Sequence, residues 1–232
     1  MTKLAEHLEE HKEEYKPWLV NNEQGRIDIK ILPYLKDIES GIFVEAGALD
    51  GLFMSNTKIL EDLGWTGVLI EPSKSAGQKC AQNRKAPIIW TALVSSNYKN
   101  KSVYGTFLYD GQDGLGARSS MVVNPHVKQE LVNVPANTMN EVLRGCGIKK
   151  VHFASIDVEG FELNVFKGFN LKEFDVDYVL TEVNFNMYDL EDMEEMMDKQ
   201  GYKNLGCISN FTKENSPGWD EAHQDYLFTK ND

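Results

Sequence analysis

The sequence is short of basic residues and has no long apolar run. It carries 24 lysine and arginine residues against 36 aspartate and glutamate residues, so its formal net charge is -12. Nucleic-acid binding depends on cationic side chains that neutralise phosphates, and this balance therefore speaks against a DNA or RNA partner. No apolar run approaches the roughly 20 residues of a membrane span, so we expect no membrane partner.

Cysteines are also few, and a leader pattern is missing. Cys80, Cys146 and Cys207 are odd in number and lack the paired CxxC spacing that is typical of zinc sites. They are therefore expected to be free thiols in a reducing compartment. The polar residues 1–16 do not resemble a signal peptide. These features predict a cytoplasmic protein, and they assign no metal ligand.

No Pro-, Gly- or Ser-rich linker and no internal repeat divides the chain, so its 232 residues are expected to form one core. Apolar residues recur at helical spacing between Leu4 and Tyr15, among many glutamates and lysines, which predicts one amphipathic helix that ends before Pro17. We therefore distinguish an N-terminal helical extension, residues 1–40, from a main domain, residues 41–232. The helix could pack on the main domain or form a homodimer with a second copy.

From residue 41 onward, apolar β-branched runs alternate with helical patterns. The predicted strands are Ile42–Ala46, Gly67–Glu71, Ile88–Leu93, Val151–Ile156, Tyr178–Val183, Tyr202–Ile208 and Asp225–Thr229, and the predicted helices are Ser55–Leu63, Ser73–Asn83, Thr138–Arg144, Phe161–Lys167 and Leu190–Lys199. This alternation predicts an α/β, Rossmann-like, doubly wound sheet whose last two strands form an antiparallel hairpin at its edge. Residues 94–134 break the regularity and are interpreted as an insertion over the crevice, with a hairpin around Val103–Tyr109.

Three carboxylates follow a strand that is expected to be buried on both faces. Asp157, Glu159 and Glu162 come directly after Val151–Ile156. In open α/β sheets ligands bind outside the carboxyl ends of the strands, so these positions are functional by geometry. The alternative is that they only cap the helix that begins near Gly160, because carboxylates stabilise a helix N-terminus.

A glycine turn and a distant acidic residue suggest a cofactor. Glu45-Ala46-Gly47-Ala48-Leu49-Asp50-Gly51 follows the first strand, and glycine lets a backbone turn tightly and a ligand approach closely. Glu71 ends the second strand, roughly 20 residues further on, where a carboxylate can accept hydrogen bonds from a ribose diol. A purely structural turn is the alternative for the glycines. Together the two elements predict an adenosine-containing cofactor.

The missing motifs narrow the choice of cofactor. The loop lacks the G-x-G-x-x-G arrangement that places a pyrophosphate on a helix N-terminus, and the chain has no G-x-x-x-x-G-K-[ST] sequence, which speaks against NAD and ATP. S-adenosylmethionine carries a sulfonium cation and no phosphate. A crevice that holds Glu45, Asp50 and Asp157 suits this cation electrostatically, so the charge pattern favours a methyl donor.

Several segments, taken in order and spacing, resemble the FkbM family of S-adenosylmethionine-dependent methyltransferases. They are Phe43–Gly51, Ile70–Pro72, Ala92–Ser95, Val132–Asn140, Ile156–Glu162 and Phe166–Gly168. The resemblance covers roughly residues 41–230. It implies a class I methyltransferase fold, with a mostly parallel seven-stranded sheet, helices on both faces and an antiparallel edge strand. It also implies transfer to a hydroxyl oxygen of a sugar or natural product, and our leading hypothesis is a saccharide or glycosylated metabolite.

The same resemblance implies roles for single residues. It implies Glu45, Gly47 and Asp50 beside the methionine portion, Ser55 and Asn56 at the amino-acid tail, Glu71 at the ribose, and Ala92 and Leu93 at the adenine. Ala48, Pro72 and Asp157 complete the expected set of cofactor-binding residues. A buried strand end is the alternative for Ala92 and Leu93.

Transfer to oxygen needs a group that removes the hydroxyl proton. Our first choice of base is Glu159, with Asp157 holding the methionine amino group or the acceptor and Glu182, at the end of the next strand, orienting it. Glu182 could instead be a strand-end carboxylate satisfied by its neighbours. A divalent metal held by Asp157, Glu182 and Asn184 is a further alternative, which the sequence does not establish.

The acceptor side is less defined. His126 and His223 are alternative bases, and Trp219 in a predicted loop could face a sugar. Carbohydrate O-methylation is the favoured function, with a small-molecule or glycan acceptor. The alternatives are a non-catalytic interaction module that keeps this fold, and an NAD-dependent oxidoreductase.

Overall fold

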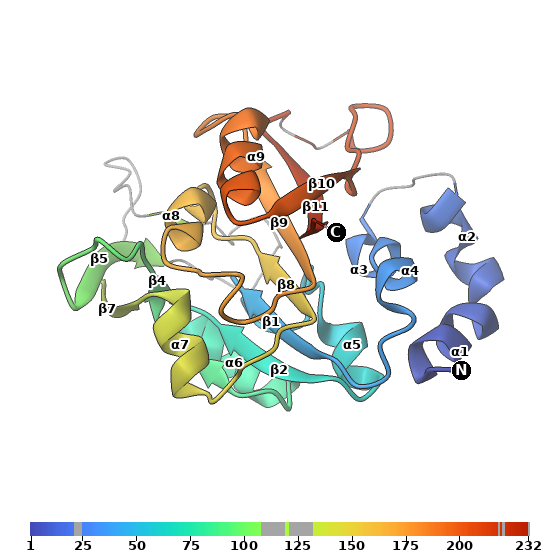
Figure 1. The fold of residues 1–232 in the computed structure, drawn as a ribbon, viewed down its shortest axis with the longest axis horizontal. Helices are drawn as coiled ribbons and strands as arrows, with labels where there is room; N and C mark the ends of the chain where they lie inside the picture. The colour runs from blue at the N-terminus through green and yellow to red at the C-terminus, as the bar shows by residue number, and fades with distance from the viewer. Residues whose placement is uncertain (21–24, 108–118, 121–131, 218, 220, 232) are drawn as a thin grey trace.

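A twisted central sheet lies between two layers of helices (Figure 1). The computed structural model describes residues 1–20, 25–107, 119–120, 132–217, 219 and 221–231. The sheet has seven strands in the order β10-β11-β9-β8-β1-β2-β3. Its strands are β1 (Ile42–Ala46), β2 (Thr66–Ile70), β3 (Ile88–Ile89), β8 (Phe153–Ile156), β9 (Tyr178–Asn184), β10 (Tyr202–Cys207) and β11 (His223–Lys230).

The sheet confirms the predicted α/β class and the predicted closing hairpin. Strands β3, β2, β1, β8 and β9 are parallel, and β11 pairs antiparallel with both β9 and β10. The antiparallel strand thus lies one place in from the edge, because β11 inserts between β9 and β10. Its first residues therefore lie beside the carboxyl end of β9, where His223 is paired with Asn184.

The predicted strand Ile88–Leu93 divides into two short strands in different sheets. β3 joins the main sheet, whereas β4 (Ala92–Leu93) pairs with β7 (Val132–Asn137) in a second sheet of order β4-β7-β5-β6. Side-chain hydrogen bonds from Trp90 to Pro72 and from Thr91 to Pro135 hold the chain at the division. Of the predicted hairpin, the structure shows β5 (Ser102–Phe107), paired with β7 and with β6 (Ser119–Ser120); residues 108–118 lie outside the described residues.

Side chains alternate between two apolar layers along the parallel strands. On one side Val44 and Ala46 pack with α7 (Met139–Gly145), α8 (Glu162–Phe166) and α9 (Leu190–Lys199). On the other, Phe43 packs with residues of α5 (Lys58–Asp62), α6 (Lys74–Asn83) and the N-terminal helices. Helices therefore cover both faces of the sheet. A ligand of such a sheet binds at the carboxyl ends of its strands.

The N-terminal segment forms four helices, so the prediction of one helix ending before Pro17 is wrong. They are α1 (Lys3–Glu10), α2 (Lys12–Val20), α3 (Ile27–Lys30) and α4 (Leu32–Leu35). Pro17 lies inside α2, where it removes one backbone donor. Burial of Tyr15 from the same helix helps to offset that loss. The penalty of a proline is local, and tertiary packing outweighs it here.

The end of this segment is built into the core. Ile29 and Leu32 have no exposed surface, and the Lys30 ammonium donates to the carbonyls of Ile208 and Ser209 at 3.1 Å each. These contacts tie α3 to the loop after β10. The apolar side chains of Leu4 and Tyr15 are buried within the same chain. A homodimer through the N-terminal helix stays a prediction, as does the division at residue 40.

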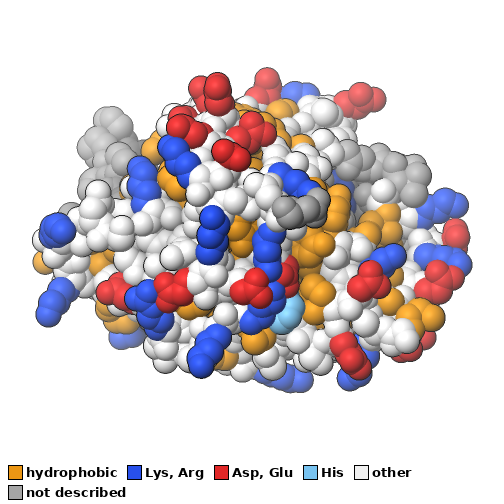
Figure 2. Space-filling model, in the orientation of Figure 1, with side chains coloured by type: hydrophobic (Ala, Val, Ile, Leu, Met, Phe, Trp, Pro, Cys, Tyr) orange, Lys and Arg blue, Asp and Glu red, His pale blue; other side chains and the backbone are white. Residues whose placement is uncertain are grey.

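The surface carries much of the acidic excess on one helix. Figure 2 shows acidic side chains gathered at the top, over α9. This helix buries Met193 and Met197 and exposes its acidic residues, Glu191, Asp192, Glu194, Glu195 and Asp198. In the part of the chain that the structure describes, no helix combines the length and apolar character that a bilayer crossing requires.

Candidate functional site

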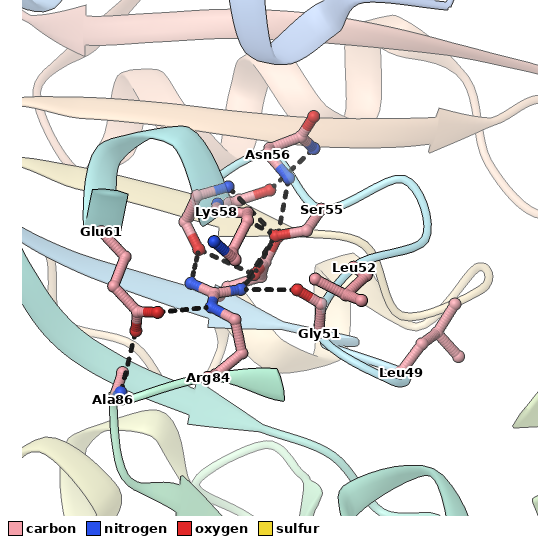
Figure 3. A network of polar contacts seen from close by, with 12 residues as sticks. Leu49, Gly51, Leu52, Ser55, Asn56, Lys58, Glu61, Arg84 and Ala86 are labelled. Atoms are coloured by element: carbon pink, nitrogen blue, oxygen red, sulfur yellow. Dashed lines mark hydrogen bonds and ion pairs between the residues drawn. The ribbon is translucent and has the colours of Figure 1, made fainter. Parts of the chain in front are cut away.

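The loop after β1 is held by a buried ion-pair network (Figure 3). The Glu45 carboxylate accepts hydrogen bonds from Ser55 Oγ at 2.9 Å, the Asn56 N–H at 2.8 Å and Thr57 Oγ1 at 2.7 Å. Arg84, at the end of α6, has a fully buried side chain that lies 3.2 Å from both Glu45 and Glu61. Glu45 therefore fixes the loop that borders the crevice, with its oxygens occupied by groups of the chain itself.

The glycine turn brings this loop against the end of β8. Gly47 has φ +86°, and a Cβ at this position would lie 1.9 Å from the backbone oxygen of Asp157. Only glycine allows both the left-handed backbone and this approach. Asp50 continues the turn, because its Oδ1 accepts the N–H groups of Leu52 and Phe53 at 2.9 and 2.8 Å.

Glu71 links the β1 loop to the segment after β2. Only 1% of the residue is exposed, and its carboxylate accepts the N–H of Leu49 at 2.9 Å and of Ser73 at 2.7 Å. Burial raises the pKa of Glu71 to about 7, against the opposing effect of these two hydrogen bonds. Each carboxylate oxygen accepts one of these bonds and keeps a second lone pair, which a ribose hydroxyl could use.

The raised pKa of Glu71 predicts that the free energy of unfolding falls as the pH rises. Its contribution to stability is fully present below pH 4.5, the ordinary pKa, and is lost as the pH rises through about 7. Between pH 5 and pH 8 the unfolding free energy of Glu71→Gln should therefore rise relative to the native chain, by about 3 kcal/mol. Urea unfolding of both proteins at the two pH values measures this difference. A difference that does not change with pH would contradict the assignment.

The turn after β8 is organised by Glu162. Glu159 and Gly160 both have left-handed backbones, with φ +58° and +91°. Glu162, the first residue of α8, accepts the N–H groups of Val158 at 2.9 Å and Gly160 at 3.1 Å, and its other oxygen accepts the Tyr188 hydroxyl at 2.8 Å. Glu162 is thus the residue whose carboxylate satisfies the N–H groups at this helix start.

A cavity of about 470 Å³ opens beside these elements. Acidic residues from three neighbouring strand ends line it: Asp157 after β8, Glu182 in β9 and Asp225 in β11. The remaining lining comes from the N-terminal segment, the β1 loop with α5 and the C-terminal part: Gly25, Arg26, Ile27, Asp28, Leu52, Met54, Ser55, Asn56, Lys58, Ile59, Asp62, Phe211 and His223.

The acidic side chains in this cavity repel one another. Burial, together with the repulsion between them and from neighbouring carboxylates, raises the pKa of Asp157 and of Glu182 well above the usual range. Burial also raises the pKa of Asp225, which His223 and Lys30 partly oppose. Within the described residues, no lysine or arginine forms an ion pair with any of the three. The cavity is therefore suited to a cationic ligand.

The predicted site residues fall into two groups. Ser55, Asn56, Asp157 and Glu182 line the cavity. The others do not: Glu45, Gly47, Ala48, Asp50, Glu71, Pro72, Ala92, Leu93 and Glu159. Most of these shape the loops around the cavity, while Ala92 and Leu93 are buried in the second sheet.

The described residues that were predicted for the acceptor side differ in their distance from the cavity. His223 lines the cavity, whereas Trp219 donates from Nε1 to the His223 carbonyl and packs on Phe211. His126 lies outside the described residues. Asp225 was missed from the sequence, although the signal was present: an antiparallel last strand begins at the edge where the parallel strands end.

Comparisons with known proteins agree with this architecture. The family described as Methyltransferase FkbM domain matches residues 45–203. A search of curated proteins gives no match. A solved S-adenosylmethionine-dependent methyltransferase from Clostridium acetobutylicum has a TM-score of 0.50 and 8% identity, over 95% of this chain and 98% of that one. A TehB-like S-adenosylmethionine-dependent methyltransferase from Corynebacterium glutamicum has 0.49 and 9%, over 97% and 98%. At such identity the structural likeness shows the fold alone.

Proposed function

Because this chain belongs to the FkbM methyltransferase family, we propose that it transfers a methyl group from S-adenosylmethionine to a hydroxyl of a saccharide or glycosylated metabolite. The observation that carries the proposal is the cavity in which carboxylates from three strand ends lie beside two aromatic rings, Phe211 and His223. A hydroxyl acceptor needs both a surface to lie on and a group that takes its proton.

The residues present suit the methyl donor. When bound, S-adenosylmethionine supplies a methyl group on a positively charged sulfur. Asp157 and Glu182 offer negative charge in the cavity, and Glu182 Oε1 is buried without a hydrogen-bond partner among the described residues. Ser55 and Asn56 add polar groups to the lining, and we assign the ribose to Glu71, which lies outside the lining and is held by the N–H groups of Leu49 and Ser73. This donor set fits a ligand with a cationic centre and a sugar.

Transfer forms a bond from the acceptor oxygen to the methyl carbon while the methyl–sulfur bond breaks, and the hydroxyl proton must leave. Asp157 and Glu182 line the cavity, whereas Glu159 does not. The lining therefore supports Asp157 and Glu182 over Glu159 as the proton acceptor, and we assign that role to Asp157, with Glu182 orienting the hydroxyl. Glu159 supports the turn, because its backbone N–H donates to the Asp157 carboxylate.

The acceptor class follows from the walls of the cavity. The rings of Phe211 and His223 meet edge to face with centroids 5.6 Å apart. An aromatic face suits the apolar face of a sugar ring. Arg26 and Asp28, paired at 2.9 Å, add polar groups to the lining. A volume of about 470 Å³ accommodates a small ligand.

An acceptor panel tests the proposal. We expect label from methyl-labelled S-adenosylmethionine to appear on free or glycosidic hydroxyls, and the product to be stable to base, as an ether is. A matched panel of amines and carboxylates should stay unlabelled. Labelling of amines would contradict the oxygen assignment. Tight cofactor binding with no labelling of any acceptor would favour the non-catalytic interaction module.

A further inference from the structure

Three carboxylates converge beside the cavity: Asp157 and Glu182 line it, and Glu162, which does not line it, is fully buried. One oxygen from each of Asp157, Glu162 and Glu182 lies within 4.8 Å of the other two. Two oxygens on opposite sides of one bound Mg²⁺ lie about 4.2 Å apart, and on one Ca²⁺ about 5 Å apart. The three oxygens thus lie within the distance that opposite ligands of one Ca²⁺ span, and small side-chain movements would bring them to the closer spacing around Mg²⁺.

A second observation indicates that this group is incomplete without a ligand. Glu182 is 9% exposed, and its Oε1 is fully buried with no hydrogen-bond partner among the described residues. A buried carboxylate oxygen without a partner is costly, because it has lost its hydration and gained nothing in return. Glu162, by contrast, is held by three donors, from Val158, Gly160 and Tyr188. It is a preorganised member of the group, and Glu182 is the one that lacks a partner.

Charge decides what kind of ligand fits. Asp225 lies in the same cavity, and no lysine or arginine in the described parts of the chain pairs with Asp157, Glu162 or Glu182. A monovalent ammonium would leave most of this negative charge uncompensated. Hard oxygen donors select Mg²⁺, Mn²⁺ or Ca²⁺ over softer metals.

We propose that Asp157 and Glu182, with one oxygen of Glu162, bind a divalent cation of the Mg²⁺ or Mn²⁺ class in the cavity. Binding of the cation does not depend on the function proposed above. Its role in catalysis, however, rests on that proposed function. A divalent ion on these oxygens would orient an acceptor hydroxyl and make it easier to deprotonate.

Mn²⁺ is the probe, measured by electron paramagnetic resonance of the free ion and by calorimetry on the full chain after treatment with chelator. We expect one Mn²⁺ per chain, with competition by Mg²⁺. Glu182→Gln should weaken binding by at least about tenfold, because it removes one charged ligand. Glu195→Gln, on the exposed face of α9, is the matched control and should leave binding unchanged.

Thermal unfolding, measured with and without metal, distinguishes a loss of metal binding from a failure of the variant to fold. Without metal, Glu182→Gln should unfold at no lower temperature than the native chain, because it removes a repelling charge. With Mn²⁺, only the native chain and the control should gain stability. Absence of stoichiometric Mn²⁺ binding, or equal binding by Glu182→Gln, would overturn the site. S-adenosylhomocysteine titrated in chelator tests the methyltransferase proposal separately, since its binding there does not require the metal.

Discussion

Arg84→Met is expected to lower the free energy of unfolding by about 3–5 kcal/mol. The substitution leaves Glu45 and Glu61 buried without their shared cation, at side-chain exposures of 5% and 6%. It also removes the donors to the Gly51 carbonyl and to Thr57 Oγ1. Removing one partner of a buried ion pair costs far more than the pair itself contributes. Urea unfolding at pH 7 measures the loss.

Arg144→Met is the matched control for Arg84. Arg144 also forms two hydrogen bonds to a glutamate, Glu173, but its side chain is 59% exposed. Breaking an exposed pair of this kind should lower the free energy of unfolding far less than breaking the Arg84 network does, because solvent screens it. Adding Glu61→Gln to Arg84→Met should recover part of the stability. Equal losses in the two arginine variants would show that the Arg84 network does not hold the β1 loop.

Asp157→Asn is expected to lower turnover by at least about a hundredfold, the usual contribution of a positioned proton acceptor. The asparagine has nearly the same shape but cannot take the hydroxyl proton or supply negative charge. Glu159→Gln should lower turnover by less than about tenfold, because Glu159 lies outside the cavity lining. Initial rates with a saturating acceptor measure both effects.

Calorimetry with S-adenosylhomocysteine separates catalysis from binding in these variants. Its affinity for Asp157→Asn should fall far less than the turnover does. A large loss of turnover in Glu159→Gln, with Asp157→Asn still active, would return the role of base to Glu159.

The strands that carry the site could be predicted because their signal is local. Ile42–Ala46 agrees residue for residue with β1, and the runs Val151–Ile156 and Tyr178–Val183 agree with β8 and β9 within two residues. Each is a mostly apolar run, as is typical of buried parallel strands, with a carboxylate within two residues of its carboxyl end. The placement of Asp157 and Glu182 at one edge of the sheet followed from topology alone.

Other parts depend on contacts that have no local signal. Glu45 was interpreted as a cofactor ligand from the charge of the crevice and from the family resemblance. Its partner Arg84, however, comes from the end of a helix that follows the next strand. The division of Ile88–Leu93 depends on hydrogen bonds from Trp90 and Thr91 to distant carbonyls. The prediction gave Pro17 its local helix-breaking penalty, which the burial of Tyr15 in the same helix helps to offset.

The most direct test of the account is a calorimetric titration of S-adenosylhomocysteine into the native chain and into Glu71→Ala, with NAD as the comparison ligand. The account predicts one site of micromolar affinity in the native chain, no heat from NAD, and an affinity at least about tenfold lower in Glu71→Ala, because the ribose loses its charged hydrogen-bond acceptor. No binding of S-adenosylhomocysteine to the native chain, or binding of NAD in its place, would contradict it.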